Sequence, residues 1–180
     1  MTSVVAIVGS ATPPGRLRRA VEEALGRADA ATELFDLAEH PLPFAGAAPV
    51  ESPVLDAIAT ADAVLLATPV YRGTYTGVLK NLLDHLPVEA LAAKPVAIAA
   101  MGATDHHHLG PDWHLRDTLA WFGALTLPTS AYLTSRDFAD GVPTARAASD
   151  LDALLATLTA FAEHLPPTLG PQPLAARARA

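Results

Sequence analysis

Residues 68–86 read Thr-Pro-Val-Tyr-Arg-Gly-Thr-Tyr-Thr-Gly-Val-Leu-Lys-Asn-Leu-Leu-Asp-His-Leu, and they join an expected strand to an expected helix. The strand is the apolar run 63–67, which is typical of a buried parallel strand. The helix is predicted over 76–86, where apolar residues recur at helical spacing until Pro87 ends the pattern. The Pro-Val-Tyr loop between them therefore lies at a strand's carboxyl end, where its backbone groups can meet a flat ring.

The rest of the chain repeats this alternation of strand and helix. Apolar runs predict further strands over 3–8, 33–37, 95–101 and 126–133. Apolar residues at helical spacing predict further helices over 17–25, 54–61, 112–123 and 151–164. Strands that alternate with helices form a parallel sheet with helices on both faces, so an α/β fold is expected. In such sheets ligands bind beyond the carboxyl ends of the strands.

The composition narrows the class of protein. The chain has 180 residues, of which 51% are hydrophobic and 17% charged, and this predicts a folded domain over 1–165. The Pro-, Ala- and Arg-rich segment 166–180 is expected to be a disordered tail. The net charge of -7, the lack of a basic stripe and the absence of cysteine argue against nucleic acid, disulfides and thiolate chemistry. No apolar run spans a membrane and no signal peptide precedes the first strand, so a cytoplasmic protein is expected.

A second loop, residues 9–16, follows the first expected strand and reads Gly-Ser-Ala-Thr-Pro-Pro-Gly-Arg. Ser10 and Thr12 supply hydroxyls, and Gly15 lets the backbone approach an anion closely. Arg16 begins a helix whose free N–H groups favour a phosphate, and its side chain can add a charge-assisted pair. A plain loop with a helix cap explains the same residues, so this segment alone leaves both interpretations open. The dinucleotide and P-loop patterns are absent from it. A phosphate site beside a ring site predicts a bound mononucleotide.

Three groups of residues resemble the NAD(P)H-dependent FMN reductase family. They are Gly9-Ser10 with Arg16, Asp36-Leu37 with Pro41-Leu42-Pro43, and Thr68-Pro69-Val70-Tyr71 with Gly77 and Leu79-Lys80-Asn81-x-x-Asp84. They cover roughly residues 3–135 in the family's order, and the third group is the most specific. The resemblance implies a flavodoxin-like three-layer sandwich with a five-stranded parallel sheet of order 2-1-3-4-5. It also implies hydride transfer from NADPH or NADH to N5 of FMN.

Within the family, the chain is most similar to the FMN reductases that supply reduced flavin to two-component monooxygenases, such as the alkanesulfonate system. The shared features are the Thr-Pro-Val-Tyr segment, a helix ending in Leu-Leu-Asp-x-Leu-Pro, and the segment Asp112-Trp113-His114-Leu115. The chain has Trp113 where that branch carries a π-bulge at a tyrosine or histidine, and Thr12 where arginine is frequent. Phosphate binding is therefore expected to be modest, or to use Arg18 or Arg19 as well.

The resemblance implies a set of cofactor-binding residues and no catalytic acid or base. The FMN phosphate would be held by Ser10, Thr12, Gly15 and Arg16. The ring would be bordered by Pro69, Val70 and Tyr71, with backbone N–H groups bonding its polar edge, and Arg72 and Thr74 would lie at the mouth. The other side of the ring would be lined by Met101, Gly102, Ala103 and Thr104. The implied partners are a nicotinamide nucleotide, flavin, a second subunit in a homodimer or tetramer, and an FMNH2-dependent monooxygenase.

Other interpretations remain open from the residues. The chain could keep FMN bound and reduce quinones or azo dyes, or act as a flavodoxin-type electron carrier or a non-enzymatic binding protein. Lys80 and Asp84 stand four residues apart and form an ordinary helix pair or an interface contact. The run 106–108 of three histidines fits no standard metal spacing, so no metal is predicted and a polar rim is expected. Trp113, Trp121 and Phe122 are expected in the core or at a subunit interface.

Overall fold

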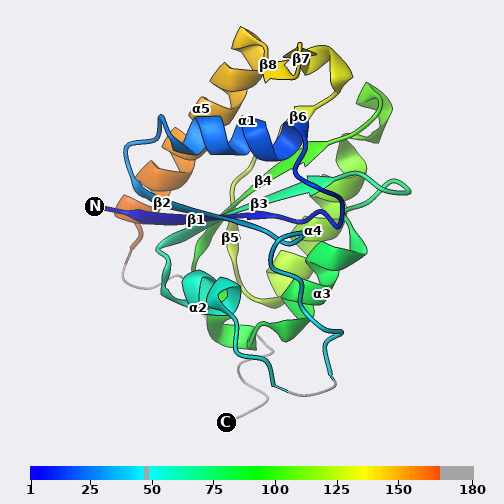
Figure 1. The fold of residues 1–180 in the computed structure, drawn as a ribbon. Coiled ribbons are helices and arrows are strands. Elements are labelled where there is room, and N and C mark those ends of the chain that lie inside the picture. The colour runs from blue at the N-terminus through cyan, green and yellow to red at the C-terminus, as the bar shows by residue number, and fades with distance from the viewer. Residues whose placement is uncertain (47–48, 167–180) are drawn as a thin grey trace.

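The structure, a computed structural model, describes residues 1–46 and 49–166, and its centre is a parallel β-sheet. The strand order is β2-β1-β3-β4-β5, and β6 also pairs with β4 (Figure 1). The sheet strands are β1 Ser3–Val8, β2 Ala31–Asp36, β3 Ala63–Pro69, β4 Pro95–Met101, β5 Leu125–Thr126 and β6 Ala131–Leu133. The order 2-1-3-4-5 and the helices on both faces confirm the predicted flavodoxin-like sandwich.

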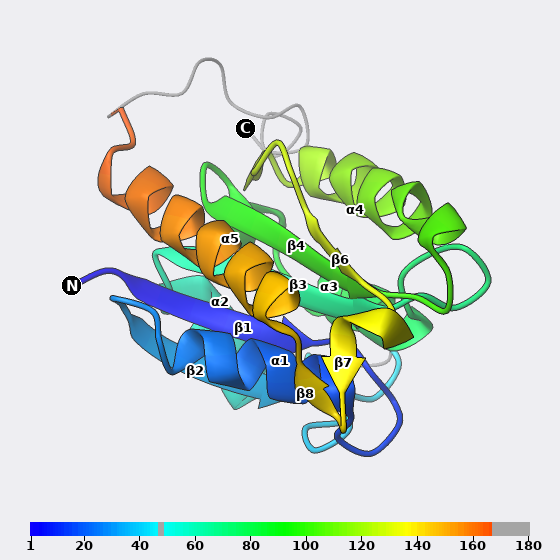
Figure 2. The ribbon, with the colours of Figure 1, turned by 90° about the horizontal axis from the view of Figure 1, so that it is seen from above.

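Within the part of the chain that the structure describes, five α-helices cover the two faces of the sheet (Figure 2). They are α1 Arg16–Leu25, α2 Pro53–Thr60, α3 Gly77–His85, α4 Leu109–Trp121 and α5 Ala145–Glu163. Helices α1 and α5 pack on one face against one core cluster, and α2, α3 and α4 pack on the other face against a second. Successive strand residues point to opposite faces, so Val4 and Ala6 join the first cluster while Val5 and Ile7 join the second. Both faces are covered, which explains why the strands read as continuous apolar runs.

Short elements complete the fold. They are the 3-10 turns η1 Val88–Leu91, η2 Asp105–His107 and η3 Ser135–Asp137, and the antiparallel hairpin of β7 Phe138–Ala139 with β8 Val142–Pro143. The hairpin follows β6 and leads directly into α5. In the described ranges, 1–46 and 49–166, we find no helix that is both long and apolar enough to cross a bilayer.

Several predicted elements differ from the structure in their limits, and two of them differ most. The strand expected over 126–133 is divided into β5 and β6, because Pro128 has no N–H for the ladder and the chain leaves the sheet there. The last helix begins at Ala145, six residues before the expected start, because the Thr144 side chain accepts the amide of Ala147 at 3.3 Å and caps it. The expected tail falls almost entirely on 167–180, which lie outside the described residues.

Candidate functional site

The loops that follow β1, β3 and β4 meet at the carboxyl edge of the sheet. Gly9 donates its amide to the carbonyl of Ala67 at 2.7 Å, which joins the first loop to β3. Val70 donates its amide to the carbonyl of Met101 at 2.8 Å, which joins β3 to β4. The structure therefore brings together residues 9–16, which we call the phosphate loop, residues 69–75, which we call the ring loop, and the segment 101–104, as the topology predicted.

Thr76 ties the first two loops to each other. Its side chain is buried, and its hydroxyl donates to the carbonyl of Gly9 at 2.6 Å. The same hydroxyl accepts the amide of Leu79 at 3.2 Å and so caps α3, while the Thr76 amide donates to the Thr68 hydroxyl at 3.2 Å. One small polar residue thus holds the end of β1, the end of β3 and the start of α3.

The phosphate loop presents hydroxyls and backbone donors around the start of α1. The hydroxyls of Ser10 and Thr12 lie 2.9 Å apart, and the Thr12 amide donates to the Ser10 hydroxyl at 3.2 Å. Helix α1 begins after Gly15 without a side-chain cap, so no side chain of the described residues accepts its first N–H groups. A Cβ at Gly15 would meet no protein atom nearer than 3.9 Å, so the protein itself leaves this approach open.

The three arginines at the start of α1 have different surroundings. Arg18 lies 3.7 Å from Asp36 and 3.5 Å from Glu39, and Arg19 donates to the Gly141 carbonyl at 3.1 Å. Arg16, over the ring of Phe138, has no hydrogen-bond or ion-pair partner within residues 1–46 and 49–166. Of the three, Arg16 is therefore the guanidinium whose donors have no protein partner among the described residues, whereas Arg18 and Arg19 are already held by these contacts.

The ring loop is a tight turn. Tyr71 and Thr74 exchange backbone hydrogen bonds of 2.9 and 3.3 Å, and Arg72 and Gly73 between them have φ of 55° and 78°. Two central residues with positive φ define a type I′ turn, for which Gly73 is well suited. Pro69 has no N–H, and the amides of Val70 and Tyr71 already donate within the protein. The expectation that these amides bond the edge of a ring is therefore corrected: in this structure they are engaged.

Helix α4 fixes the ring loop from outside. A Cβ at Gly110 would lie 1.9 Å from the carbonyl oxygen of Gly73, so only glycine allows this approach. The Nδ1 of His114 lies 2.7 Å from the Thr74 hydroxyl, which places His114 beside the ring loop. Neither contact could be predicted from the sequence, because the two partners of each contact lie about 40 residues apart along the chain.

The segment 101–104 is shaped by Tyr132, a residue that sequence reasoning did not single out. The Tyr132 hydroxyl donates to the carbonyl of Thr104 at 2.8 Å, and burial, followed by the nearby Asp105, raises the pKa of this phenol. A Cβ at Gly102 would lie 1.9 Å from the Tyr132 hydroxyl oxygen. Gly102 is thus needed for packing on Tyr132, in addition to any clearance it gives a ring.

A cavity of about 490 Å³ opens between the phosphate loop, the segment after β2 and the ring loop. Its lining is mostly apolar and consists of Ala11, Leu37, Ala38, Pro41, Leu42, Phe44, Tyr71, Thr76, Gly77, Val78 and Asn81. Of the residues predicted to bind the cofactor, Tyr71 lines this cavity, whereas Pro69, Val70, the segment 101–104 and the four predicted phosphate residues do not. The wall formed by 37–44 was missed, although the Pro-Leu-Pro run at 41–43 was the available signal.

Asn81 holds that wall in place. Its side-chain oxygen accepts the amide of Ala45 at 2.9 Å, and its side-chain nitrogen donates to the carbonyl of Pro43 at 2.9 Å. His85, one turn further along α3, adds a ring-nitrogen contact of 2.8 Å to the same carbonyl. The Asn81 of the motif in α3 therefore acts on the loop after β2, whereas Lys80 and Asp84 form an exposed pair at 2.5 Å.

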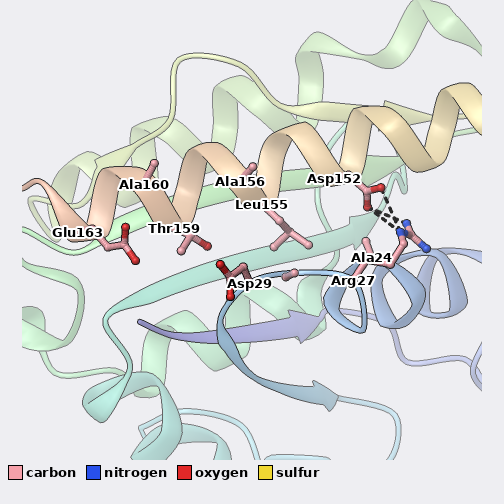
Figure 3. A pocket seen from close by; sticks show the side chains of 10 residues that line it. Ala24, Arg27, Asp29, Asp152, Leu155, Ala156, Thr159, Ala160 and Glu163 are labelled. Atoms are coloured by element: carbon pink, nitrogen blue, oxygen red, sulfur yellow. Dashed lines mark hydrogen bonds and ion pairs between the residues drawn. The ribbon is translucent and has the colours of Figure 1, made fainter. Parts of the chain in front are cut away.

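A second cavity, of about 430 Å³, lies between α1 and α5 (Figure 3). Arg27 and Asp152 face each other across it with a contact of 2.7 Å. Glu163, also in its lining, accepts from Thr2, the residue just before β1. This cavity therefore lies toward the amino end of the strands, and none of the predicted site residues lines it.

The histidine run 106–108 lies at the start of the η2–α4 segment and is exposed. His108 contacts the carbonyl of Asp105 through Nδ1 at 3.0 Å. Across the described ranges, no three histidine, aspartate or glutamate side chains come together as metal ligands.

The sheet order and the three loops at its carboxyl edge define a flavodoxin-like α/β protein. The chain belongs to the NADPH-dependent FMN reductase family, whose model matches residues 2–139.

Individual relatives agree with this family. An FMN reductase (NADPH) of Pseudomonas aeruginosa is 47% identical over 85 residues, which span 47% of this chain and 46% of the relative. The NADH-dependent FMN reductase SfnF of Pseudomonas fluorescens is 42% identical over 117 residues, 64% of this chain and 63% of the relative. The chain thus matches about half to two thirds of these relatives' lengths. The crystal structure of apo NADH:FMN oxidoreductase EMOB superimposes with a TM-score of 0.71 at 28% identity, over 89% of each chain.

Proposed function

We propose that this protein is an NAD(P)H-dependent FMN reductase. Family membership supports the proposal, and the observation that carries it is that the loop before the uncapped start of α1 contributes Ala11 to a cavity that Tyr71 also lines. When bound, FMN supplies the redox chemistry by accepting a hydride from NADPH or NADH. FMN and the nicotinamide nucleotide are therefore the proposed cofactor and substrate.

The phosphate end of FMN fits the residues of the first loop. We assign it to the hydroxyls of Ser10 and Thr12, the open backbone at Gly15 and the guanidinium of Arg16. All of these groups can donate hydrogen bonds, and the positive end of the α1 dipole lies beside them. An isolated phosphate dianion needs this kind of donor set, and the described side chains put no carboxylate in hydrogen-bond contact with Ser10, Thr12 or Arg16.

The ring end fits the apolar side of the site. We place Pro69, Val70 and Tyr71 along one edge, with Arg72 and Thr74 at the mouth. The segment of Met101, Gly102, Ala103 and Thr104 forms the other proposed side. The engaged amides of Val70 and Tyr71 keep the loop rigid, so their contribution is shape and stacking surface.

In the reaction, the residues of the protein bind and orient FMN and the nicotinamide nucleotide. Proton transfer by a side chain is not required for hydride transfer, so we assign no catalytic acid or base. The apolar lining of the cavity limits water on the Tyr71 side of the proposed ring site, and Asn81 fixes the wall formed by 37–44 against α3.

We further propose that FMN is a loosely held substrate that leaves after reduction and feeds an FMNH2-dependent monooxygenase. Thr12 stands where the family often has arginine, and the sparse hydroxyls after Arg16 favour modest phosphate affinity. The proposal includes a homodimer or tetramer, a cytoplasmic location and a flavin-binding domain over 1–165. The alternative to this release of reduced FMN is a reductase that keeps FMN bound as a prosthetic group and reduces quinones or azo dyes.

The experiment that tests the function is a purification followed by an assay of NADPH and NADH oxidation with and without added FMN. A flavin-shuttling reductase is colourless after dialysis, and its nicotinamide oxidation depends on added FMN. Stoichiometric yellow flavin with turnover indifferent to added FMN indicates the prosthetic-group reductase. No nicotinamide oxidation under either condition contradicts the proposed function.

The phosphate assignment has its own test. Arg16→Ala is expected to narrow the preference for FMN over riboflavin by about 1.5–3 kcal/mol, the contribution of a charged hydrogen bond. Arg27→Ala is the matched control, because Arg27 lies at the other end of α1 beside Asp152. Equal affinity of the wild type for FMN and riboflavin contradicts the assignment.

A further inference from the structure

The β7–β8 hairpin lies beside the start of α1, next to the proposed phosphate loop (Figure 2). Two contacts join them. The Arg16 Cζ atom lies 5.4 Å from the centre of the Phe138 ring, and Arg19 donates to the carbonyl of Gly141 at 3.1 Å. Phe138 is far from Arg16 in sequence, and Phe138 has no role in the proposed function described above.

The hairpin is held firmly at its base. Asp137 is buried, and its Oδ2 accepts the amide of Thr134 at 2.7 Å and the Thr134 hydroxyl at 3.1 Å. Asp137 also pairs with Arg146 of α5, and its carbonyl accepts the amide of Thr144 at 2.8 Å. Phe138 follows Asp137 directly, so its half-buried ring has a defined position against α1.

Stacking on Phe138 leaves the donors of Arg16 free. A guanidinium is planar, and an aromatic ring attracts it through its flat face. Its N–H groups point outward in the plane, so the same group can stack on a ring and bind an oxyanion through its edge. Arg16 is exposed and has no hydrogen-bond or ion-pair partner among the described residues, so without the ring its long side chain would sample many rotamers.

We propose that Phe138 is a positioning residue for FMN recognition, which holds the Arg16 guanidinium over its ring and aims its free N–H edge at the phosphate. The proposal rests on the proposed function, because it takes the α1 loop as the phosphate site. It adds that discrimination between FMN and riboflavin depends on a hairpin more than 120 residues away in sequence.

The test compares dissociation constants for FMN and riboflavin, measured by quenching of flavin fluorescence in the full-length protein. Phe138→Leu keeps an apolar side chain and removes the ring, and Phe138→Met serves in its place if the leucine variant does not fold. Phe138→Tyr keeps the ring. Phe161→Leu on α5 is the matched control, because Phe161 is partly exposed and lies outside the site.

We expect Phe138→Leu to weaken FMN binding about two- to fivefold, as loss of an exposed cation–π contact would, and to leave riboflavin binding unchanged. Phe138→Tyr and Phe161→Leu should bind FMN as the wild type does. In an Arg16→Ala background, Phe138→Leu should have no further effect, because the side chain that it positions is gone.

Two results overturn the inference and leave the reductase standing. One is an equal loss of FMN and riboflavin affinity in Phe138→Leu, which indicates a general structural role. The other is unchanged FMN affinity in Phe138→Leu while Arg16→Ala still narrows the preference. Equal affinity of the wild type for FMN and riboflavin contradicts the phosphate site itself, and therefore also the role of Phe138.

Discussion

Gly9 and Gly77 lie in the same region, but the space around a side chain at the two positions differs. A Cβ on Gly9 would lie 2.6 Å from the Cβ of Leu79, because α3 crosses very close to the end of β1. A Cβ on Gly77 would meet no protein atom within 4 Å. The first glycine is a packing requirement, whereas the second faces open space at the start of α3 beside the cavity.

Gly9→Ala is expected to lower the free energy of unfolding by about 1–3 kcal/mol, because the methyl group overpacks against Leu79. Gly77→Ala is the control and should be neutral or stabilising by up to about 1 kcal/mol, since alanine favours the helix. Urea denaturation followed by circular dichroism measures both changes. Equal destabilisation by the two variants would contradict the close approach at Gly9.

Residue types in the phosphate loop could be predicted from the sequence, but the surroundings of the glycines could not. Ser10, Thr12 and Arg16 follow an obvious strand, and their chemistry indicates an anion. The need for glycine at 102 comes from Tyr132, and that at 110 comes from the carbonyl of Gly73. Those contacts depend on how β6 and α4 pack, which no local pattern states.

Helix α4 carries two tryptophans that do not pack in the core of the protein. The exposed fraction is 64% for Trp113 and 62% for Trp121, and the two stand eight residues apart on one side of the helix. Trp113, Trp121 and Phe122 were each predicted to lie in the core or at a subunit interface. Phe122 is buried in the core, whereas the two tryptophans are not.

Trp113→Ala is expected to change the free energy of unfolding of the single chain by less than about 1 kcal/mol, because the indole buries little there. We expect it to change FMN retention or turnover instead, through the second subunit of the proposed oligomer. Leu115→Ala is the contrasting control: Leu115 is fully buried, and its loss should cost about 2–5 kcal/mol. Denaturant unfolding and the Michaelis constant for FMN are the two measurements, and a large stability loss in Trp113→Ala with unchanged FMN kinetics would refute the idea.

The starts of β1 and β3 are joined by Asp62. The Asp62 Oδ2 accepts the amide and the hydroxyl of Ser3, both at 2.8 Å. These hydrogen bonds, the backbone one first, lower the pKa of Asp62 below its ordinary value of 3.8. A carboxylate with a lowered pKa stabilises the folded state at pH values above 3.8, and this contribution is lost as the pH falls through the folded-state pKa.

Asp62→Asn is therefore expected to be less stable than the wild type at pH 7 by less than about 1 kcal/mol, because the site is exposed and screened. The difference should shrink below about pH 4, as the wild-type carboxyl also becomes neutral. Urea denaturation of both proteins between pH 7 and pH 2.5 tests this. Asp29→Asn serves as the control, and a difference that grows on acidification would contradict the assignment.

The existence of the main strands and helices could be predicted from hydrophobic periodicity, whereas the limits of only some of them could. Six strand residues of β1 read the same way in the sequence and in the structure. The division of the last strand depends on Pro128, which ends one short ladder before β6 begins another. The early start of α5 depends on a threonine cap that precedes a stretch with little apolar content.

The exposed apolar side chains bear on the assembly of the whole molecule. Trp113, Trp121, Tyr71 and Leu109 are exposed by 45% or more, and all lie on α4 or on the ring loop that α4 contacts. Such aromatic surface is typical of an interface that completes a site.

We expect a homodimer or a tetramer of two dimers at micromolar concentration, measured by multi-angle light scattering. Trp121→Glu should shift the protein toward the monomer, because a C2 interface would bring two buried charges together. Phe161→Glu, on the other face, is the control and should leave the assembly unchanged. A wild-type monomer at micromolar concentration would contradict the expectation.

The order of the sheet could be predicted for the whole molecule, because the resemblance reached from β1 to the last strand. The cavity could be predicted only in part. Tyr71 was identified, but the wall at 37–44 is set in place by Asn81, about 40 residues further along the chain. Contacts of this kind join segments that are distant in sequence, and they follow from the packed fold.

The hydrogen bonds of Thr76 have a consequence for how the site opens. Since this one hydroxyl links Gly9 to the cap of α3, the phosphate loop cannot separate from the ring loop without also fraying the first turn of that helix. The two loops therefore form one cooperative unit, and any fluctuation large enough to release a molecule from one end of the site loosens the other end too. We therefore expect a bound flavin to dissociate in one step, with its phosphate end and its ring end released together.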